Sequence, residues 1–539
     1  MIMSVRIVLC FSAALLSSTG QASQNSESAQ TWFKQGAERA HALGAGKQKA
    51  KNVILFVGDG MSIPTVAAAR IYEGQQRKET GEENRLSFET FNNTAFSKTY
   101  NTDSQTPDSA GTMTAMITGA KTRMGFLSVN QIPARGECAK PEYSLASAIT
   151  LAKSAGLATG VVTTTRITHA TPAATYAHTS ERNWESDADM PDAAKAQGCL
   201  DIAQQLLQYA NRTGIDVVMG GGLNKFLPVG SYPAYNSTKG SRTDNRNLIA
   251  DWRAAQSNTT FVHTGSALAA LDLGKTAKLV GLFNGDHLNY DYDRRTDSED
   301  EPSLADMTKA AITVLNRNGK GFFLVVEGGR IDHAHHSGNA FRALTDTVAF
   351  SDAVRAARAM TSENDTLIVV TADHAHTMSF IGYPQRGNPI LGKVIGKSSE
   401  DAPPGLVKDL LGKPMTTLVY ANGPGYSGAS KQQPAGSKQF PHNPGGYFEA
   451  ATGRPDLTDV DTEHPNFMQE ALVPGNSETH GGDDVGIWAS GPGSQAVRGS
   501  LEQNVIFHIL TQPQPLIHRY LCTQGFCDKG VPDKLPISR

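Results

Sequence analysis

The sequence predicts an α/β fold: a doubly wound, mostly parallel central sheet flanked by helices, with an inserted irregular, crown-like subdomain. Three observations support this prediction. Short apolar runs rich in β-branched residues stop at glycine or at polar residues, as buried parallel strands do. From residue 51 to about 383 these runs alternate with helical stretches, which is the pattern of a doubly wound sheet. Between residues 384 and 476 Gly, Pro, Ser, Asn and Gln dominate, which predicts an irregular insert.

The individual elements follow from these patterns in chain order. Strands are predicted at Val53–Val57, Gly160–Thr164, Asp216–Met219, Phe322–Val326, Leu367–Val370 and Val485–Ser490. Helices are predicted at Ala29–Leu43, Ala193–Asn211, Ser303–Asn316 and Leu501–Leu510. A disordered linker is the alternative for residues 384–476, but the apolar run Thr416–Tyr420 favours a folded subdomain. We therefore expect one α/β domain at residues 23–383 and 477–530, interrupted by the 384–476 subdomain and followed by a tail at 531–539.

The first 22 residues predict a cleavable secretory signal. Met1–Arg6 carries a positive charge, Ile7–Leu16 is apolar, and Gly20-Gln21-Ala22 offers small residues for cleavage. The apolar stretch is too short to span a bilayer, and no later segment approaches about 18 uninterrupted apolar residues. We expect a secreted or periplasmic protein with no membrane span in the mature chain. An amphipathic or buried N-terminal helix is the alternative interpretation.

The charge balance argues against a nucleic-acid partner. The formal net charge is -3 and the pI is near 6.6. Basic residues are scattered along the chain and form no run that would follow a phosphate backbone. Any binding of anions must therefore be local.

The cysteines favour disulfide bonds. Removal of the signal would take Cys10 and leave an even number, Cys138, Cys199, Cys522 and Cys527. Pairing Cys522 with Cys527 closes a tight loop and leaves Cys138 for Cys199, although the other connectivities stay open. A zinc-binding cysteine cluster is the rival, but no two cysteines show CxxC spacing.

Asp332 and His336 have the spacing of metal ligands. If Asp332 opens a helix, the two side chains lie one turn apart on the same face. Carboxylate oxygen and imidazole nitrogen are both ligands that zinc accepts. His333 and His335 add more imidazole than a solvated helix start requires. The alternative is a polar helix N-terminus with Asp332 as its cap.

Two further acidic positions follow predicted strands. Asp373-His374 comes directly after a buried strand, where charged groups are costly unless they are bound or paired. His376 would orient one of these ligands through a hydrogen bond. Asp59 stands between two glycines, which let the backbone turn tightly beside a metal ion. Asp-Gly is also ordinary turn chemistry, so this signal is weak alone.

Glu327 and His480 extend the set of candidate ligands. Glu327 ends an unbroken apolar strand and needs a cation or a donor at that position. His480 lies among glycines and acidic residues before another strand. A satisfied loop histidine is the alternative for His480.

Ser109 is the candidate nucleophile. It follows Pro107 and precedes the helical pattern Thr112–Ile117, so it lies near a helix N-terminus. The free N–H groups there favour an alkoxide and a bound phosphate. A plain cap is the alternative, and Asp108 could equally be that cap. No Gly-x-Ser-x-Gly elbow surrounds Ser109, so activation by a metal ion is favoured over a hydrolase triad.

Taken together, these motifs resemble the alkaline phosphatase family, in its animal-type branch. They occur in the family's order and extend over residues 50 to 530 or so. The segments that carry the resemblance are Val57–Met61, Pro107–Thr112, Thr164–His178, Val326–His336, Thr371–His376, Asn422–Tyr426 and Glu478–His480.

The resemblance implies a site with two Zn²⁺ ions and one Mg²⁺ ion. The ligands implied for one zinc are Asp332, His336 and His480, and those for the other are Asp373, His374 and Asp59. The ligands implied for magnesium are Thr171, Glu327 and Asp59, which would bridge two of the ions. His169 and His333 are implied to lie near the magnesium without binding it, where other branches carry Asp and Lys.

The resemblance also implies the reaction. Ser109 would become phosphoserine, and Arg182 would grip two phosphate oxygens, since a guanidinium binds two oxygens at once. Substrates would be small phosphate monoesters of broad range, because recognition falls on the phosphoryl group. The family is implied to be homodimeric, with the 384–476 insert at or near the interface.

Two rival functions use the same residues. A phosphodiesterase or sulfatase would keep the metal core, but Ser109 lacks the surroundings of a sulfatase modification motif, and a diesterase need not have Arg182. A non-catalytic zinc-holding protein has no need of Ser109 and Arg182. The monoesterase is therefore the favoured prediction.

Overall fold

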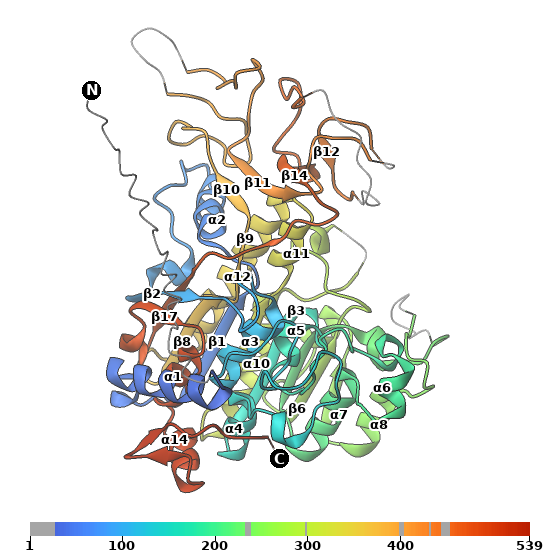
Figure 1. Cartoon of the computed structure of the whole chain (residues 1–539), viewed down its shortest axis with the longest axis vertical. Helices are drawn as coiled ribbons and strands as arrows, with labels where there is room; N and C mark the ends of the chain where they lie inside the picture. The colour runs from blue at the N-terminus through green and yellow to red at the C-terminus, as the bar shows by residue number, and fades with distance from the viewer. Residues whose placement is uncertain are drawn as a thin grey trace, which may run out of the picture.

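The computed structural model describes residues 27–231, 239–296, 299–397, 404–430, 433–442 and 453–538. Its main body is a ten-stranded sheet with helices on both faces, and a smaller part built by the insert stands above one end of it (Figure 1). The predicted signal at residues 1–22 lies outside the described residues. The α/β fold class that the sequence predicts is confirmed.

The strands of the large sheet come from distant parts of the chain. In spatial order they are β17 (Gly499–Glu502), β2 (Asn93–Lys98), β16 (Val485–Ser490), β8 (Thr366–Ala372), β1 (Asn52–Gly58), β7 (Phe322–Gly328), β3 (Ala158–Arg166), β4 (Val217–Gly221), β6 (Lys278–Leu282) and β5 (Thr259–Val262). The strands from β8 to β5 in this order are parallel to one another. Only β16 pairs antiparallel, with both β2 and β8. The sheet is therefore mostly parallel.

Three acidic positions reach one edge of the sheet because their strands are neighbours in register. Gly58 at the end of β1 is opposite Gly328 of β7 and Ala372 of β8. Asp59 and Asp373 each follow the last residue of a strand, and Glu327 is the next-to-last residue of β7. Ligands in such sheets bind outside the carboxyl ends of the strands. The register alone thus brings three carboxylates to this edge.

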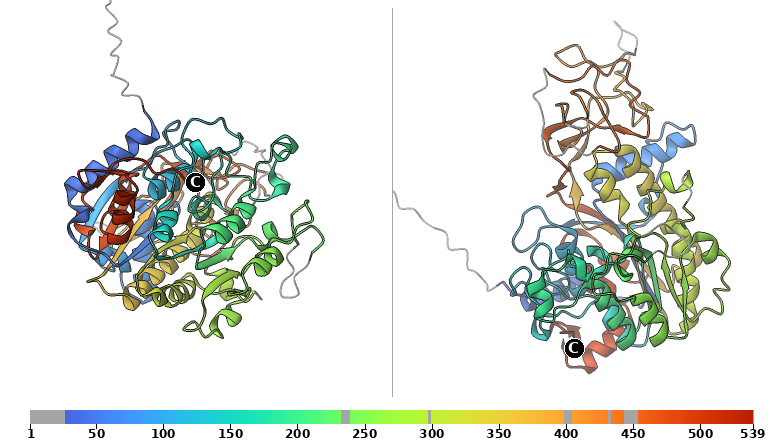
Figure 2. Two further views of the ribbon diagram at one scale, coloured as in Figure 1. Left: turned by 90° about the horizontal axis from the view of Figure 1, so that it is seen from below. Right: turned by 90° about the vertical axis from the view of Figure 1, so that its right-hand side faces the viewer.

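Side chains along each central strand point alternately into two separate cores. In β1, Val53, Leu55 and Val57 belong to one core, and Ile54 and Phe56 to the other. The helices packed into the first core are α1 (Ala29–Leu43), α3 (Ser109–Thr118), α4 (Ala148–Ser154), α5 (Ala170–Ala173), α7 (Ile202–Arg212), α8 (Leu248–Ala255), α13 (Val505–Thr511) and α14 (Pro515–Thr523). Those packed into the second are α2 (Ile63–Gln76), α9 (Gly265–Ala269), α10 (Leu304–Leu315), α11 (Arg330–His336) and α12 (Ala340–Met360). Views from below and from the side show both helical layers (Figure 2).

Two predicted helices differ from the structure. The helix predicted at Ala193–Asn211 is two helices, α6 (Asp192–Ala196) and α7. Gly198 between them has φ 81°, a conformation outside the helical region, and Asp201 caps the start of α7. The helix predicted at Leu501–Leu510 begins only at Val505, because Leu501 belongs to the edge strand β17. The predicted helix at Ala29–Leu43 is confirmed with the same bounds.

Small sheets form in and beside the predicted insert. Strands β11 (Leu418–Gly423) and β14 (Ala471–Pro474) of the insert share a sheet with β10 (Met378–Phe380), which precedes it. Within the insert, β12 (Lys438–Gln439) pairs with β13 (Phe467–Met468). These strands lie at the top of Figure 1. Much of the remaining described chain there is irregular.

The predicted disulfide bonds are present in the structure. Cys138 is bonded to Cys199 and Cys522 to Cys527, where β18 (Cys527–Asp528) pairs with β19 (Val531–Pro532). The favoured connectivity is therefore confirmed. Among the described residues, no helix has the length and apolar character needed to cross a bilayer.

Candidate active site

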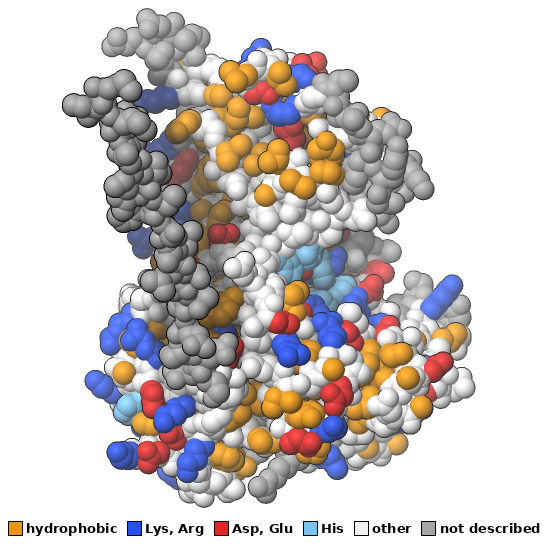
Figure 3. Space-filling model, in the orientation of Figure 1, with side chains coloured by type: hydrophobic (Ala, Val, Ile, Leu, Met, Phe, Trp, Pro, Cys, Tyr) orange, Lys and Arg blue, Asp and Glu red, His pale blue; other side chains and the backbone are white. Residues whose placement is uncertain are grey.

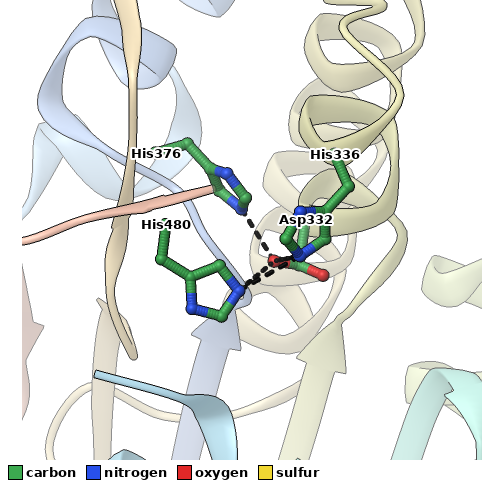
Figure 4. A group of neighbouring side chains, drawn as sticks. All are labelled: Asp332, His336, His376 and His480. Atoms are coloured by element: carbon green, nitrogen blue, oxygen red, sulfur yellow. Dashed lines mark hydrogen bonds and ion pairs between the residues drawn. The ribbon is translucent and has the colours of Figure 1, made fainter. Parts of the chain in front are cut away.

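Three histidines surround one carboxylate oxygen. Oδ1 of Asp332 lies 2.7 Å from Nε2 of His376, 3.3 Å from Nε2 of His336 and 3.4 Å from Nε2 of His480. Figure 4 shows the three rings converging on Asp332, which shares α11 with His336. The third ring, His480, arrives through a two-stranded sheet in which β15 (His480–Gly481) pairs with β9 (Ala375–His376).

His336 and His480 are prepared to bind a cation. Nδ1 of His336 donates to the carbonyl of Glu478 at 2.6 Å, and Nδ1 of His480 donates to the carbonyl of Pro107 at 2.8 Å. Each Nε2 therefore carries a lone pair, and the two Nε2 atoms lie 3.1 Å apart. Two lone pairs this close repel each other unless a positive charge lies between them. This pattern is typical of histidine ligands to zinc.

His376 plays a different part in the same group. Its Nδ1 faces Oε2 of Glu478, and its Nε2 faces Oδ1 of Asp332. Burial opposes the charged ring, but the Glu478 and Asp332 carboxylates outweigh it and raise the pKa of His376 to about 10. Both ring nitrogens thus donate to carboxylates, so His376 has no free lone pair for a metal ion. This geometry supports the predicted orienting role.

A second group lies beside Ser109. Nε2 of His374 is 3.3 Å from Oδ1 of Asp59 and 3.4 Å from Oδ2 of Asp373. Asp373 is held by the backbone N–H of Gly60 at 3.1 Å and by the hydroxyl of Thr112 at 3.2 Å. All of these side chains except that of Thr112 come from the ends of the neighbouring strands β1 and β8.

Ser109 is the first residue of α3 and does not cap it. Asp108 is the N-cap, and its Oδ1 accepts from the N–H of Gly111 at 3.1 Å. Oγ of Ser109 is therefore free to face the second group, 3.2 Å from Nε2 of His374 and 3.5 Å from Oδ1 of Asp59. The sequence allowed either Ser109 or Asp108 as the N-cap of this helix, and in the structure the N-cap is Asp108.

A third group surrounds Glu327. Asp59, His169 and Glu327 each offer an atom within 4.8 Å of the others. Oδ2 of Asp59, Nδ1 of His169 and Oε1 of Glu327 are buried, and none has a hydrogen-bond partner among the described residues. Thr163 and Thr165 hydrogen-bond to Oε2 of Glu327 and partly offset the effect of burial on its pKa. The Thr171 hydroxyl is buried and has no hydrogen-bond partner among the described residues. Unpartnered buried polar atoms gathered in one place, two of them carboxylate oxygens, fit a cation.

Arg182 lies between these groups and the surface. Its Nη1 donates to Oδ2 of Asp108 at 3.0 Å, and its Nη2 is 3.3 Å from Nε2 of His169. His333 is hydrogen-bonded to Arg330, and its ring centroid lies 5.5 Å from that of His169.

The predicted site residues of the three groups therefore meet at one end of the sheet. Figure 3 shows the histidines of this region, in pale blue, in a hollow with Lys and Arg side chains next to them.

The carboxylates of the site need positive charge. Burial, and then the neighbouring carboxylates Asp373, Asp332 and Glu327, raise the pKa of Asp59 well above its ordinary value. Burial likewise raises the pKa of Glu327 to about 7. Such crowding of acids is costly unless cations are bound among them. Together with the histidine lone pairs, it indicates a site for more than one metal ion.

Comparison with known proteins decides the family. The model of the family described as "Alkaline phosphatase" matches residues 50–514. The chain belongs to the alkaline phosphatase family. The tissue-nonspecific alkaline phosphatase isozyme of Mus musculus is 42% identical over 469 residues, covering 86% of this chain and 83% of the relative. The alkaline phosphatase of Gadus morhua is 41% identical over 471 residues, covering 86% and 91%.

Solved structures show the same fold. The alkaline phosphatase of Thermus thermophilus matches with a TM-score of 0.59 at 23% identity, covering 88% of this chain and 95% of that one. The alkaline phosphatase of the Antarctic bacterium TAB5 matches with a TM-score of 0.56 at 22% identity, covering 87% and 99%. Our chain is an alkaline phosphatase, a phosphoric monoester hydrolase (EC 3.1.3.1). The function predicted from the sequence is confirmed, and its rivals are set aside.

Two residues of this alkaline phosphatase site, Glu478 and His287, were not predicted from the sequence. Glu478 was part of a recognised motif, but nothing local shows that its carboxylate meets His376. His287 lies 4.3 Å from His333 between ring centroids and follows β6 after a short loop. The rule that polar residues after buried strands gather at one edge could have found it. Gly221 makes room for that loop, because a Cβ there would lie 2.0 Å from the Asp286 carbonyl.

Proposed function

We propose that this alkaline phosphatase hydrolyses a broad range of phosphate monoesters through a phosphoserine intermediate on Ser109, with two Zn²⁺ ions and one Mg²⁺ ion. The observation that carries the proposal is the place of the Ser109 hydroxyl. It lies within 3.5 Å of both His374 and Asp59, at the N-terminal end of a helix that another residue caps. A hydroxyl in that place is suited to attack phosphorus.

The three groups of side chains fit these ions. Asp332, His336 and His480 would hold one zinc, and Asp59, Asp373 and His374 the other. Asp59, Glu327 and Thr171 would hold magnesium, with His169 beside them. When bound, the ions lower the pKa of a hydroxyl and of a water molecule and neutralise phosphoryl oxygens.

The protein's own residues orient the reaction. Asp108 holds Nη1 of Arg182 at 3.0 Å and also accepts from the N–H groups of Gly111 and Gly125. The guanidinium is therefore fixed beside the N-terminus of α3, where its planar N–H groups suit two phosphoryl oxygens. Oγ of Ser109 bonds to phosphorus as the alcohol leaves, and water then releases phosphate from Ser109. Because these residues would recognise the phosphoryl group, the structure of the alcohol can vary.

We also propose a homodimer with the insert at or near its interface. Large apolar side chains in the insert are exposed in the single chain, above all Leu410 at 106% and Leu472 at 79%, as is Tyr383 directly before the insert at 98%. Exposed apolar residues gathered on one part of a protein are typical of interfaces. Burial against a second copy would remove them from water.

The sequence supports two further proposals, on where the protein is located and on how the chain is divided into domains. We propose secretion or periplasmic export, with residues 1–22 removed. The two disulfides agree with an oxidising compartment.

We further propose that residues 23–383 and 477–530 form the catalytic domain, that 384–476 form the inserted subdomain, and that 531–539 form the tail.

Hydrolysis of p-nitrophenyl phosphate at alkaline pH tests the proposed function. The mature chain is assayed before and after EDTA, and again with zinc plus magnesium added back. Bis-p-nitrophenyl phosphate is the matched diester control. Loss and recovery of monoesterase activity, with little diesterase activity, is the expected result. Activity that survives complete metal removal would overturn the proposal.

A further inference from the structure

Glu478 is a buried carboxylate next to the first group of candidate ligands. The residue is 1% exposed, and its side chain is fully buried. Oε2 faces Nδ1 of His376, and Oε1 accepts from the backbone N–H of Thr377 at 2.7 Å and from the Thr377 hydroxyl. Both oxygens are thus used, and the carboxylate has one orientation relative to His376.

The backbone of Glu478 holds a second member of the group. Its N–H donates to the carbonyl of His336 at 2.9 Å, and its carbonyl accepts from Nδ1 of His336 at 2.6 Å. His480 follows only two residues later in the chain. One residue therefore contacts His336 through its backbone and His376 through its side chain.

The segment around Glu478 is itself fixed to the insert. Thr479 and Asn422 exchange two hydrogen bonds of 3.0 Å, from the Thr479 N–H and from the Asn422 side-chain amide. Gly423 has φ 129°, and a Cβ there would lie 3.0 Å from Cβ of Glu478. Because only glycine suits that conformation and that approach, β11 can pack directly against Glu478.

We propose that Glu478 is a positioning residue for the metal group of Asp332, His336 and His480. Its carboxylate fixes the His376 ring, and the ring's Nε2–H then fixes Oδ1 of Asp332 at 2.7 Å. Without Glu478 the His376 ring can turn, and Asp332 loses a donor that sets its orientation. The inference rests on the proposed function, since it assumes that this group holds zinc.

Glu478→Gln tests the side chain alone. The amide keeps one oxygen for Thr377 but puts an NH₂ group where Oε2 accepted from His376. The backbone contacts with His336 are unchanged. Loss of such a supporting contact weakens metal binding by roughly 10–100-fold. We expect one zinc of the full chain to be held that much more weakly in a chelator competition, and the other zinc to be unaffected.

A double-mutant cycle separates positioning from general support. His376→Asn removes the group that reaches Asp332. If Glu478 acts through His376, Glu478→Gln adds no further loss of zinc affinity in the His376→Asn background. Glu470→Gln is the matched control, because Glu470 is a half-buried carboxylate that pairs with Arg454 within the insert. It should keep both zinc affinities.

The outcomes are distinct. Full zinc affinity in Glu478→Gln, or losses that add in the double variant, would overturn the inference while leaving the proposed function intact. A wild-type chain that binds no zinc would overturn the proposed function and this inference with it. If Glu478→Gln does not fold, Glu478→Asp draws the carboxylate back by one methylene, and the same weakening is expected. Thermal unfolding of the EDTA-treated chains checks that each variant is folded.

Discussion

Oγ of Ser109 lies 3.2 Å from Nε2 of His374, although the two residues are 265 positions apart in the chain. The contact exists because α3 begins at Ser109 beside the turn that follows β8, and this turn carries His374. Asp108 caps the helix, so the serine hydroxyl is left for chemistry. Two adjacent residues thus have separate roles: Asp108 caps the helix, and Ser109 is the nucleophile that we propose.

Ser109→Ala should remove most of the turnover without loss of metal. The substitution takes away the attacking oxygen but none of the candidate ligands. Zinc and magnesium contents are measured by elemental analysis alongside p-nitrophenyl phosphate hydrolysis. An unchanged rate would mean that another residue is the nucleophile.

Arg182→Lys should weaken binding of phosphate more than it alters metal content. A lysine supplies a point charge in place of two fixed N–H donors, and a hydrogen bond to a charged group contributes about 1.5–3 kcal/mol. We expect the inhibition constant of inorganic phosphate to rise by roughly 10–100-fold, as 1.4 kcal/mol is tenfold. Glu181→Gln, next in the chain and bonded to Arg135 on the protein surface, is the control. Equal effects of both variants would count against the assigned role.

His169→Asp should lower the magnesium concentration needed for full activity. A ring nitrogen of His169 lies within 4.8 Å of carboxylate oxygens of Asp59 and Glu327, and Mg²⁺ prefers oxygen ligands to nitrogen. Activity is titrated against magnesium in EDTA-treated enzyme resupplied with zinc. The same magnesium dependence in both enzymes would remove His169 from this site.

The two disulfides should differ in their contribution to stability. Cys138 and Cys199 are 61 residues apart, whereas Cys522 and Cys527 are 5 apart. In the chain-entropy model the longer loop gives about 4 kcal/mol and the shorter about 2 kcal/mol. Replacing each pair by serine and measuring chemical unfolding tests the order. A larger cost for the C-terminal pair would contradict it.

Two buried histidines away from the site should make the fold sensitive to acid. Burial lowers the pKa of His508 to about 3 and that of His178 to about 4, the latter despite a hydrogen bond to the Ser128 carbonyl. Unfolded histidine has a pKa of about 6.5, so below that pH the unfolded chain binds protons that the folded chain does not. The free energy of unfolding therefore falls as pH falls from about 6.5 towards 3–4.

His508→Leu isolates this effect. The ring packs against Phe33 at a centroid distance of 4.6 Å, so an apolar side chain of similar size suits the place. The variant should lose up to about 1.4 kcal/mol per pH unit of acid sensitivity in that window. Denaturant unfolding at several pH values measures it. An unchanged slope of stability against pH would refute the prediction.

The sequence predicts the parts of the site that obey a local rule. Asp59, Glu327 and Asp373 lie at or just after the ends of buried strands, and neighbouring parallel strands bring them together. His480 obeys no such rule, because it reaches the site by pairing of β15 with β9, and its assignment depended on the family resemblance. Glu478 was missed since its role lies in one long-range contact.

The same limit applies to the fold. Strand runs such as Val485–Ser490 are predicted to the residue, because burial on both faces leaves a continuous apolar signal. The break between α6 and α7 is missed, because a single glycine does not end a helical pattern by itself. There Gly198 in a left-handed conformation and the Cys138–Cys199 bond decide the path of the chain.

Direct detection of phosphoserine tests the central claim most sharply. The zinc- and magnesium-loaded enzyme is mixed with a phosphate monoester, quenched in acid and digested for mass spectrometry, with Ser109→Ala as the control. The account predicts one added phosphoryl group on Ser109 and none in the variant. A phosphoryl group on another residue, or turnover in the variant at the wild-type rate, would contradict it.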